Sequence, residues 1–211
     1  MPGRRDFLVS VSSGTGLLLA GCLDGTDSSE DSTETSPDAT NTQTDDTVST
    51  TRSNASGLQL SSTAFEDGGN IPQKYTFDGA DVSPPLSISG VPADADSLVL
   101  VVDDPDAPNP PFTHWLLWDI PADTTAIPAG IEQSRTAPEL DGAKQGTNSF
   151  DVLGYRGPRP PKGDGSHTYR FTLTAVERPL NVQAGASRDQ IADALQGNSV
   201  ATARITGEYE R

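Results

Sequence analysis

Short apolar runs, separated by proline and glycine, make up most of the chain after residue 56 and predict strands rather than helices. Seven such runs have the length and composition of strands: 59–65, 75–77, 86–88, 98–103, 114–120, 168–177 and 201–209. Strict alternation is clearest around the sixth run, where His167, Tyr169 and Phe171 share one face with Leu173 and Ala175. We expect a mainly β fold, a Greek-key-type β-sandwich with one or two short peripheral helices.

One stretch has the pattern of a helix. Ser187 is a suitable N-cap, Gln190 follows three residues later as its capping-box partner, and Gly197 is placed to end the helix. Between them, Ile191, Ala194 and Leu195 form a narrow apolar stripe. We expect a helix over 187–196 that packs on an edge of the sandwich.

The first 22 residues have the order of an export signal. Arg4 and Arg5 precede an apolar run over 7–20, which at 14 residues is shorter than the roughly 20 that a membrane-spanning helix needs. The sequence Leu-Ala-Gly-Cys then ends at Cys22, the single cysteine of the chain, as in a lipoprotein signal. We expect export by the twin-arginine route and lipidation of Cys22 at the outer face of the cytoplasmic membrane. The alternative is a plain signal peptide that happens to end in cysteine.

Residues 23–56 are rich in Ser, Thr and Asp and contain almost no large apolar side chains. Such a segment cannot bury enough surface to offset its conformational entropy, and its like charges repel one another. We therefore expect three parts: a signal peptide over 1–22, a disordered acidic tether over 23–56, and a folded domain over 57–211.

The chain carries a net charge of −16, and this excess of carboxylates excludes nucleic acid as a partner, because phosphate backbones are bound by Lys and Arg. Only three lysines are present. Strong acidity with few lysines is typical of halophilic proteins, in which hydrated carboxylates maintain solubility. The alternative is an acidic linker attached to an ordinary secreted domain.

Several polar residues have no place in a sandwich core: Asp104, Asp106, His114, His167 and Tyr169. The two aspartates lie in a turn fixed by Pro105 and Pro108, and the two histidines are the only ones in the chain. A carboxylate beside two imidazoles favours their protonated forms, and we expect two partly cationic rings that bind an anion, with Asp104 orienting a ring. Period-two alternation adds Trp118 to the face of His114. The alternatives are turn capping by the aspartates, satisfied core histidines, and a metal triad.

Three blocks resemble motifs of the phosphatidylethanolamine-binding protein family, in its prokaryotic Raf-kinase-inhibitor-like branch. They are Gly-Ala-Asp-Val-Ser-Pro-Pro-Leu over 79–86, Asp-Pro-Asp-Ala-Pro over 104–108 with Phe-Thr-His-Trp over 112–115, and Gly-Pro-Arg-Pro-Pro-Lys-Gly over 157–163 with His-Thr-Tyr-Arg-Phe over 167–171. Their order and spacing match from about residue 58 to residue 209.

The resemblance implies a small pocket for phosphate-like or carboxylate-like anions, lined by Asp104, His114, His167 and Tyr169, with no cofactor and no metal. This chain differs from its relatives in carrying Arg159 at the variable position of the proline-rich loop and Asn198 where relatives often have histidine. The function expected is a non-catalytic binding module for a small anion or an anionic lipid head group. The alternatives are a hydrolase or lyase that uses the Asp and His side chains, and an inhibitor of an extracellular hydrolase.

Overall fold

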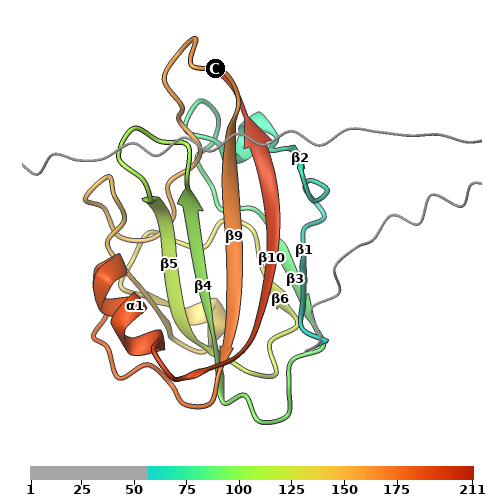
Figure 1. Cartoon of the computed structure of the whole chain (residues 1–211), viewed down its shortest axis with the longest axis vertical. Helices are drawn as coiled ribbons and strands as arrows, with labels where there is room; N and C mark the ends of the chain where they lie inside the picture. Colours follow the sequence, from blue (N-terminus) through green and yellow to red (C-terminus); the bar gives the residue numbers. More distant parts are fainter. Residues whose placement is uncertain (1–56) are drawn as a thin grey trace, which may run out of the picture. The chain divides into compact units, whose positions relative to one another are not determined.

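In the computed structural model, which describes residues 57–211, ten strands form two sheets, and these confirm the predicted β-sandwich (Figure 1). The large sheet has the order β2-β10-β9-β4-β5-β8-β7, with bounds Gly69–Asn70, Ser199–Tyr209, His167–Val176, Ser97–Asp104, Phe112–Pro121, Ala143–Gln145 and Thr136–Ala137. The small sheet has the order β1-β3-β6, with bounds Gln59–Ser61, Leu86–Ser89 and Ala126–Ile127. All neighbours are antiparallel except β2 and β10.

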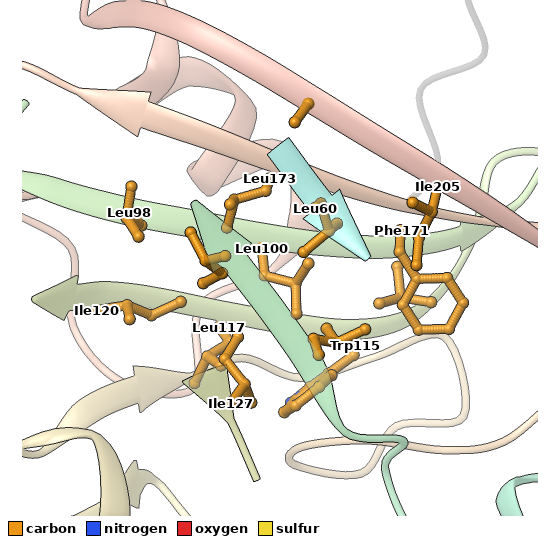
Figure 2. Close-up of a cluster of buried hydrophobic side chains, with 14 of the residues drawn as sticks. Leu60, Leu98, Leu100, Trp115, Leu117, Ile120, Ile127, Phe171, Leu173 and Ile205 are labelled. Carbon is orange, nitrogen blue, oxygen red and sulfur yellow. The ribbon is translucent and has the colours of Figure 1, made fainter. Parts of the chain in front are cut away.

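The main core fills the space between the two sheets (Figure 2). Leu60 on β1 and Ile127 on β6 lie against the large sheet, whose inward residues alternate with outward ones as the pleat requires. Those inward residues include Leu98, Leu100, Trp115, Leu117, Ile120, Phe171, Leu173 and Ile205. Each such side chain contributes about 1.5–3 kcal/mol when it is withdrawn from water, so this core holds the strands in register.

The predicted helix is present as α1, over Arg188–Leu195. The backbone N–H of Ser187 donates to Oε1 of Gln190 at 3.0 Å, and Gly197 adopts a positive φ of 67° just beyond the helix. Ile191 is buried in a second apolar cluster with Val99 on β4 and Trp118 on β5. The helix therefore covers the outer face of the large sheet rather than an edge of the sandwich.

The prediction of a strand over 75–77 is wrong. Residues Gln73–Tyr75 form a 3-10 turn that follows Pro72, and Thr76 closes the turn twice, because its backbone N–H and its hydroxyl both donate to the Gln73 carbonyl. These local bonds replace the pairing that a strand would need. The short strands β2, β6, β7 and β8 were not predicted, since two or three residues carry too little alternation to be recognised.

The predicted signal peptide over 1–22, the acidic tether over 23–56 and Cys22 lie outside the described residues. Within residues 57–211, no helix has the length and hydropathy needed to cross a membrane.

Gln145 fixes the packing of the largest core side chain. Its Oε1 accepts a 2.8 Å hydrogen bond from Nε1 of Trp115, and its Nε2 donates to the carbonyls of Glu132 and Ser134 at 2.7 and 3.2 Å. Both side chains are fully buried. A fully satisfied buried amide is stabilising only as long as all its partners remain.

We predict that Gln145→Leu lowers the free energy of unfolding by about 2–4 kcal/mol, because it leaves one buried N–H and two carbonyls without partners. Denaturant unfolding followed by tryptophan fluorescence measures this. Gln196→Leu is the control, since the Gln196 amide is exposed and bonds only to Asp193. A loss of less than about 1 kcal/mol for Gln145→Leu would contradict the account.

Candidate functional site

The side chain of Asp104, the last residue of β4, links this strand to the start of β9. Its Oδ1 accepts hydrogen bonds from the backbone N–H groups of Asp106 and Ala107, at 2.8 and 3.0 Å, and so holds the proline-rich turn. Its Oδ2 lies 2.8 Å from Nδ1 of His167, the first residue of β9. Asp104 thus orients an imidazole, as the sequence predicted.

The surroundings of His167 favour its protonated form. Burial alone would lower its pKa, but the hydrogen bond and charge of Asp104, together with Asp164 and Asp106, outweigh burial and raise the pKa above its ordinary value. Its second nitrogen, Nε2, lies 3.5 Å from a carboxylate oxygen of the exposed Asp164. That distance is long for a hydrogen bond, so the outer nitrogen of a charged ring is held only weakly.

A β-bulge turns His114 toward the interior. Along β4 and β5, Val102 pairs with Trp115 and Asp103 pairs with Thr113, which leaves His114 as the extra residue. The ring of His114 meets the ring of Tyr169 edge-on, with 5.1 Å between centroids. His114 and the adjacent Trp115 therefore both point to the inner side of the large sheet.

Burial favours the neutral form of His114, against the expectation of two partly cationic rings. Burial lowers its pKa, and the opposing effects of the Arg156 carbonyl and the Asp104 charge do not compensate. Nδ1 of His114 lies 2.7 Å from the carbonyl oxygen of Arg156. Because a carbonyl can only accept, Nδ1 carries the proton and Nε2 is left as an acceptor.

Tyr169 brings an unsatisfied donor to the same place. Its side chain is buried, and its hydroxyl makes no hydrogen bond of good geometry among the described residues, although the Arg159 backbone and the Asp104 carboxylate lie close enough to affect its pKa. Burial, together with the nearby Asp104 carboxylate, raises the pKa of Tyr169, so the phenol keeps its proton. Tyr169 and His167 are two residues apart on β9 and share one face of the strand. Asp104, His114, His167 and Tyr169 thus form one cluster, called the His–Tyr cluster below.

The segment 79–86, the first of the three blocks that resemble family motifs, fixes the backbone next to this cluster. Asp81 has a positive φ of 54°, and its carboxylate accepts bonds from the Gly157 N–H and the Arg156 guanidinium, both at 2.7 Å. A side chain at Gly157 would clash with the backbone of Tyr75 and Thr76, at 2.6–2.7 Å. Asp81 thereby fixes the position of the Arg156 carbonyl that determines the tautomer of His114.

Two aromatic side chains beside His114 were not predicted from the sequence. The rings of Phe112 and Phe150 both lie 5.5 Å from the ring of His114, centroid to centroid, and 4.9 Å from each other. Phe150 is positioned by Asn148, whose Oδ1 accepts its backbone N–H at 2.9 Å. An Asn-Ser-Phe turn is the only signal in the sequence for this contact, and it carries no periodicity.

Three further residues singled out in the sequence have side chains that make contacts outside the cluster. Trp118 packs in the second cluster, behind the large sheet, because the bulge at His114 breaks the alternation on which its assignment rested. The exposed Asp106 accepts the Thr168 N–H at 2.8 Å and so acts at the start of β9. Arg159 stacks on the ring of Phe77 at 4.0 Å. Its guanidinium at the rim is therefore engaged with an aromatic ring.

A metal triad is the alternative role for the same aspartate and histidines. Within residues 57–211 no three His, Cys, Asp or Glu side chains converge with metal-ligand spacing. The polar groups of the cluster instead supply two donors, from His167 and Tyr169, and one acceptor, Nε2 of His114.

Relatives of known sequence and structure match the whole described domain. A UPF0098 protein of Methanothermobacter thermautotrophicus is 43% identical over 73% of this chain and 99% of its own length, and a UPF0098 protein of Aquifex aeolicus is 41% identical over 73% and 89%. Two crystal structures each cover 74% of this chain and 99% of their own. One is YbcL of Escherichia coli, with a TM-score of 0.69 and 33% sequence identity. The other is the homologue CT736 of Chlamydia trachomatis, with a TM-score of 0.66 and 35% sequence identity. The model of the phosphatidylethanolamine-binding protein family matches residues 61–210, and the chain belongs to this family.

Proposed function

We propose that this protein is a non-catalytic binding module that holds a small phosphate-type anion, or the phosphate of a lipid head group, on the His–Tyr cluster. The observation that carries the proposal is the buried Tyr169 hydroxyl, which makes no hydrogen bond of good geometry, beside His167, whose pKa is raised by Asp104. A buried donor without a partner costs about 1–3 kcal/mol, and an anion that accepts from it would recover that energy.

The neutral His114 narrows the class of ligand. An acceptor nitrogen repels the lone pairs of an oxyanion, so a ligand that occupies all three groups must itself donate one proton. A singly protonated phosphomonoester does so: two oxygens accept from His167 and Tyr169, and its P–OH donates to Nε2 of His114. A carboxylate has no such proton, so we propose phosphate over carboxylate.

We further propose that the domain is exported, anchored through Cys22 and active in high salt. The support is the order of Arg4-Arg5, the apolar run and the Leu-Ala-Gly-Cys sequence, together with a net charge of −16.

Tyr169→Phe provides the sharpest test of the ligand site. It should weaken binding of a phosphomonoester by about tenfold or more, the value of a hydrogen bond to a charged group. It should also leave the free protein as stable as before, or about 1 kcal/mol more stable, because an unsatisfied buried hydroxyl is removed. Isothermal calorimetry and denaturant unfolding measure the two effects.

Tyr155→Phe is the matched control for that experiment. Its hydroxyl donates to the Tyr75 carbonyl at 2.6 Å, so this change should cost about 1 kcal/mol of stability without weakening phosphate binding. Equal affinities for the wild type and Tyr169→Phe would remove the basis of the proposal. Release of inorganic phosphate during the titration would favour the hydrolase instead.

The pKa values of the two histidines should be shifted in opposite directions from the ordinary value. His167 should gain its proton above the ordinary pKa of about 6.5 and His114 only below it, and NMR of the two imidazoles measures both. For stability, the contribution of His167 is complete below its unfolded pKa and is lost as the pH rises through its folded pKa. The sign for His114 is opposite: its contribution is lost as the pH falls below its unfolded pKa.

Anion affinity should fall as the pH rises through the pKa of His167. The ligand's own protonation affects every variant alike, so the difference between the wild type and His167→Gln isolates the histidine. Identical pH profiles for the two proteins would show that His167 does not carry the charge that attracts the ligand.

For the anchor, we predict that Cys22→Ser moves the protein from the membrane fraction to the medium or leaves it unprocessed. Arg4→Lys combined with Arg5→Lys should keep the precursor inside the cell. Fractionation of the expressing cells followed by intact mass measurement reads out both, and membrane association unchanged in both variants would argue against the proposal.

A further inference from the structure

A groove lies on the outer face of the large sheet, on the side opposite to the His–Tyr cluster. Its floor comes from β4, β9 and β10 and its wall from α1, and it encloses about 200 Å³. In Figure 1, α1 lies beside β5 at one side of the sheet, and β9 and β10 follow beyond β4. Drug-sized ligands occupy about 300–1,000 Å³, so this groove suits a smaller molecule.

Three arginines line the groove, and Asp103 is the only carboxylate among its lining residues, although the charges of Asp104 and Asp106 also act on Arg170. Arg170 comes from β9, Arg188 from α1 and Arg204 from β10, and the acid is Asp103 on β4. The chain as a whole carries a net charge of −16, so a local excess of positive charge departs from its general composition. Such a concentration of arginine attracts anions.

Asp103 shows how these arginines hold a carboxylate. Arg170 binds it through two nitrogens, Nε and one Nη, at 2.8 and 2.9 Å, and Arg188 adds a third contact at 2.9 Å. The Asp103 side chain is nearly fully buried, whereas the side chains of Arg170 and Arg188 are about one-third exposed. One internal acid therefore orients two guanidiniums, and each guanidinium has more N–H groups than these contacts use.

Arg204 supplies the third cation. Its Nε donates to the Thr172 hydroxyl at 3.0 Å, which orients the guanidinium, and the residue is exposed. The groove is amphipathic, since Val101, Ile191 and Leu195 line it beside the arginines. These apolar side chains favour a ligand that carries hydrocarbon as well as charge.

We propose that this groove binds a short-chain organic carboxylate, with the head group on Arg188 and Arg204 and the hydrocarbon against Ile191 and Leu195. A planar guanidinium matches a carboxylate in the manner that Arg170 and Asp103 already display. The site is independent of the His–Tyr cluster, because Asp103 and Asp104 are consecutive on β4 and project to opposite faces of the sheet.

The test uses hexanoate as the probe and hexan-1-ol as its uncharged counterpart, with the full chain at one fixed salt concentration. Backbone amide NMR should show hexanoate shifting signals of 170–174, 188–195 and 202–206, while hexan-1-ol shifts them much less. Arg204→Gln should weaken hexanoate binding by about tenfold, the loss of one charge-assisted hydrogen bond.

Arg178→Gln is the matched control, because Arg178 is exposed and does not line the groove. Arg188→Gln removes the guanidinium that α1 contributes to the groove, and it replaces Arg204→Gln in the test if that variant does not fold. Equal chemical-shift changes with hexanoate and hexan-1-ol would mean that the groove binds hydrocarbon without using its arginines, and would overturn the proposal. So would shifts confined to His114 and His167, or equal affinities for Arg204→Gln, Arg188→Gln and Arg178→Gln.

Discussion

The rest of the site depends on a single buried carboxylate, that of Asp104. One of its oxygens closes the turn after β4 and the other fixes His167 at the start of β9. The same charge raises the pKa of His167 and helps keep Tyr169 protonated. Geometry and protonation of the cluster therefore have one source, and neutralising Asp104 would disturb both.

Much of this arrangement was predictable because the relevant signals are local. Three features depend only on residues that are close together in the sequence: the alternation over 167–175, the capping box at Ser187 and the Asp-Pro-Asp-Ala-Pro turn. The role of Asp104 followed from chemistry alone, since a carboxylate next to imidazoles orients a ring more readily than it binds a second anion. The sandwich likewise followed from strand periodicity.

The errors arose where one extra residue or a distant partner decides the outcome. The bulge at His114 reverses the alternation and removes Trp118 from the site, and no local signal marks it. The lowered pKa of His114 depends on burial, and its tautomer depends on the Arg156 carbonyl, 42 residues away in sequence. Phe150 reaches the same ring through a turn without periodicity. Contacts of this kind exist only after the chain has folded.

The bulge also gives the protein an internal optical probe. The chain has two tryptophans, and the bulge fixes one of them, Trp115, directly beside His114 and edge-on to Tyr155, while Trp118 remains behind the sheet. Because Trp115 follows His114 directly and points to the same side of the sheet, we expect a change of charge at the cluster to alter the electric field more at its indole than at that of Trp118. The emission of Trp115 would then report on the site, with that of Trp118 as an internal reference.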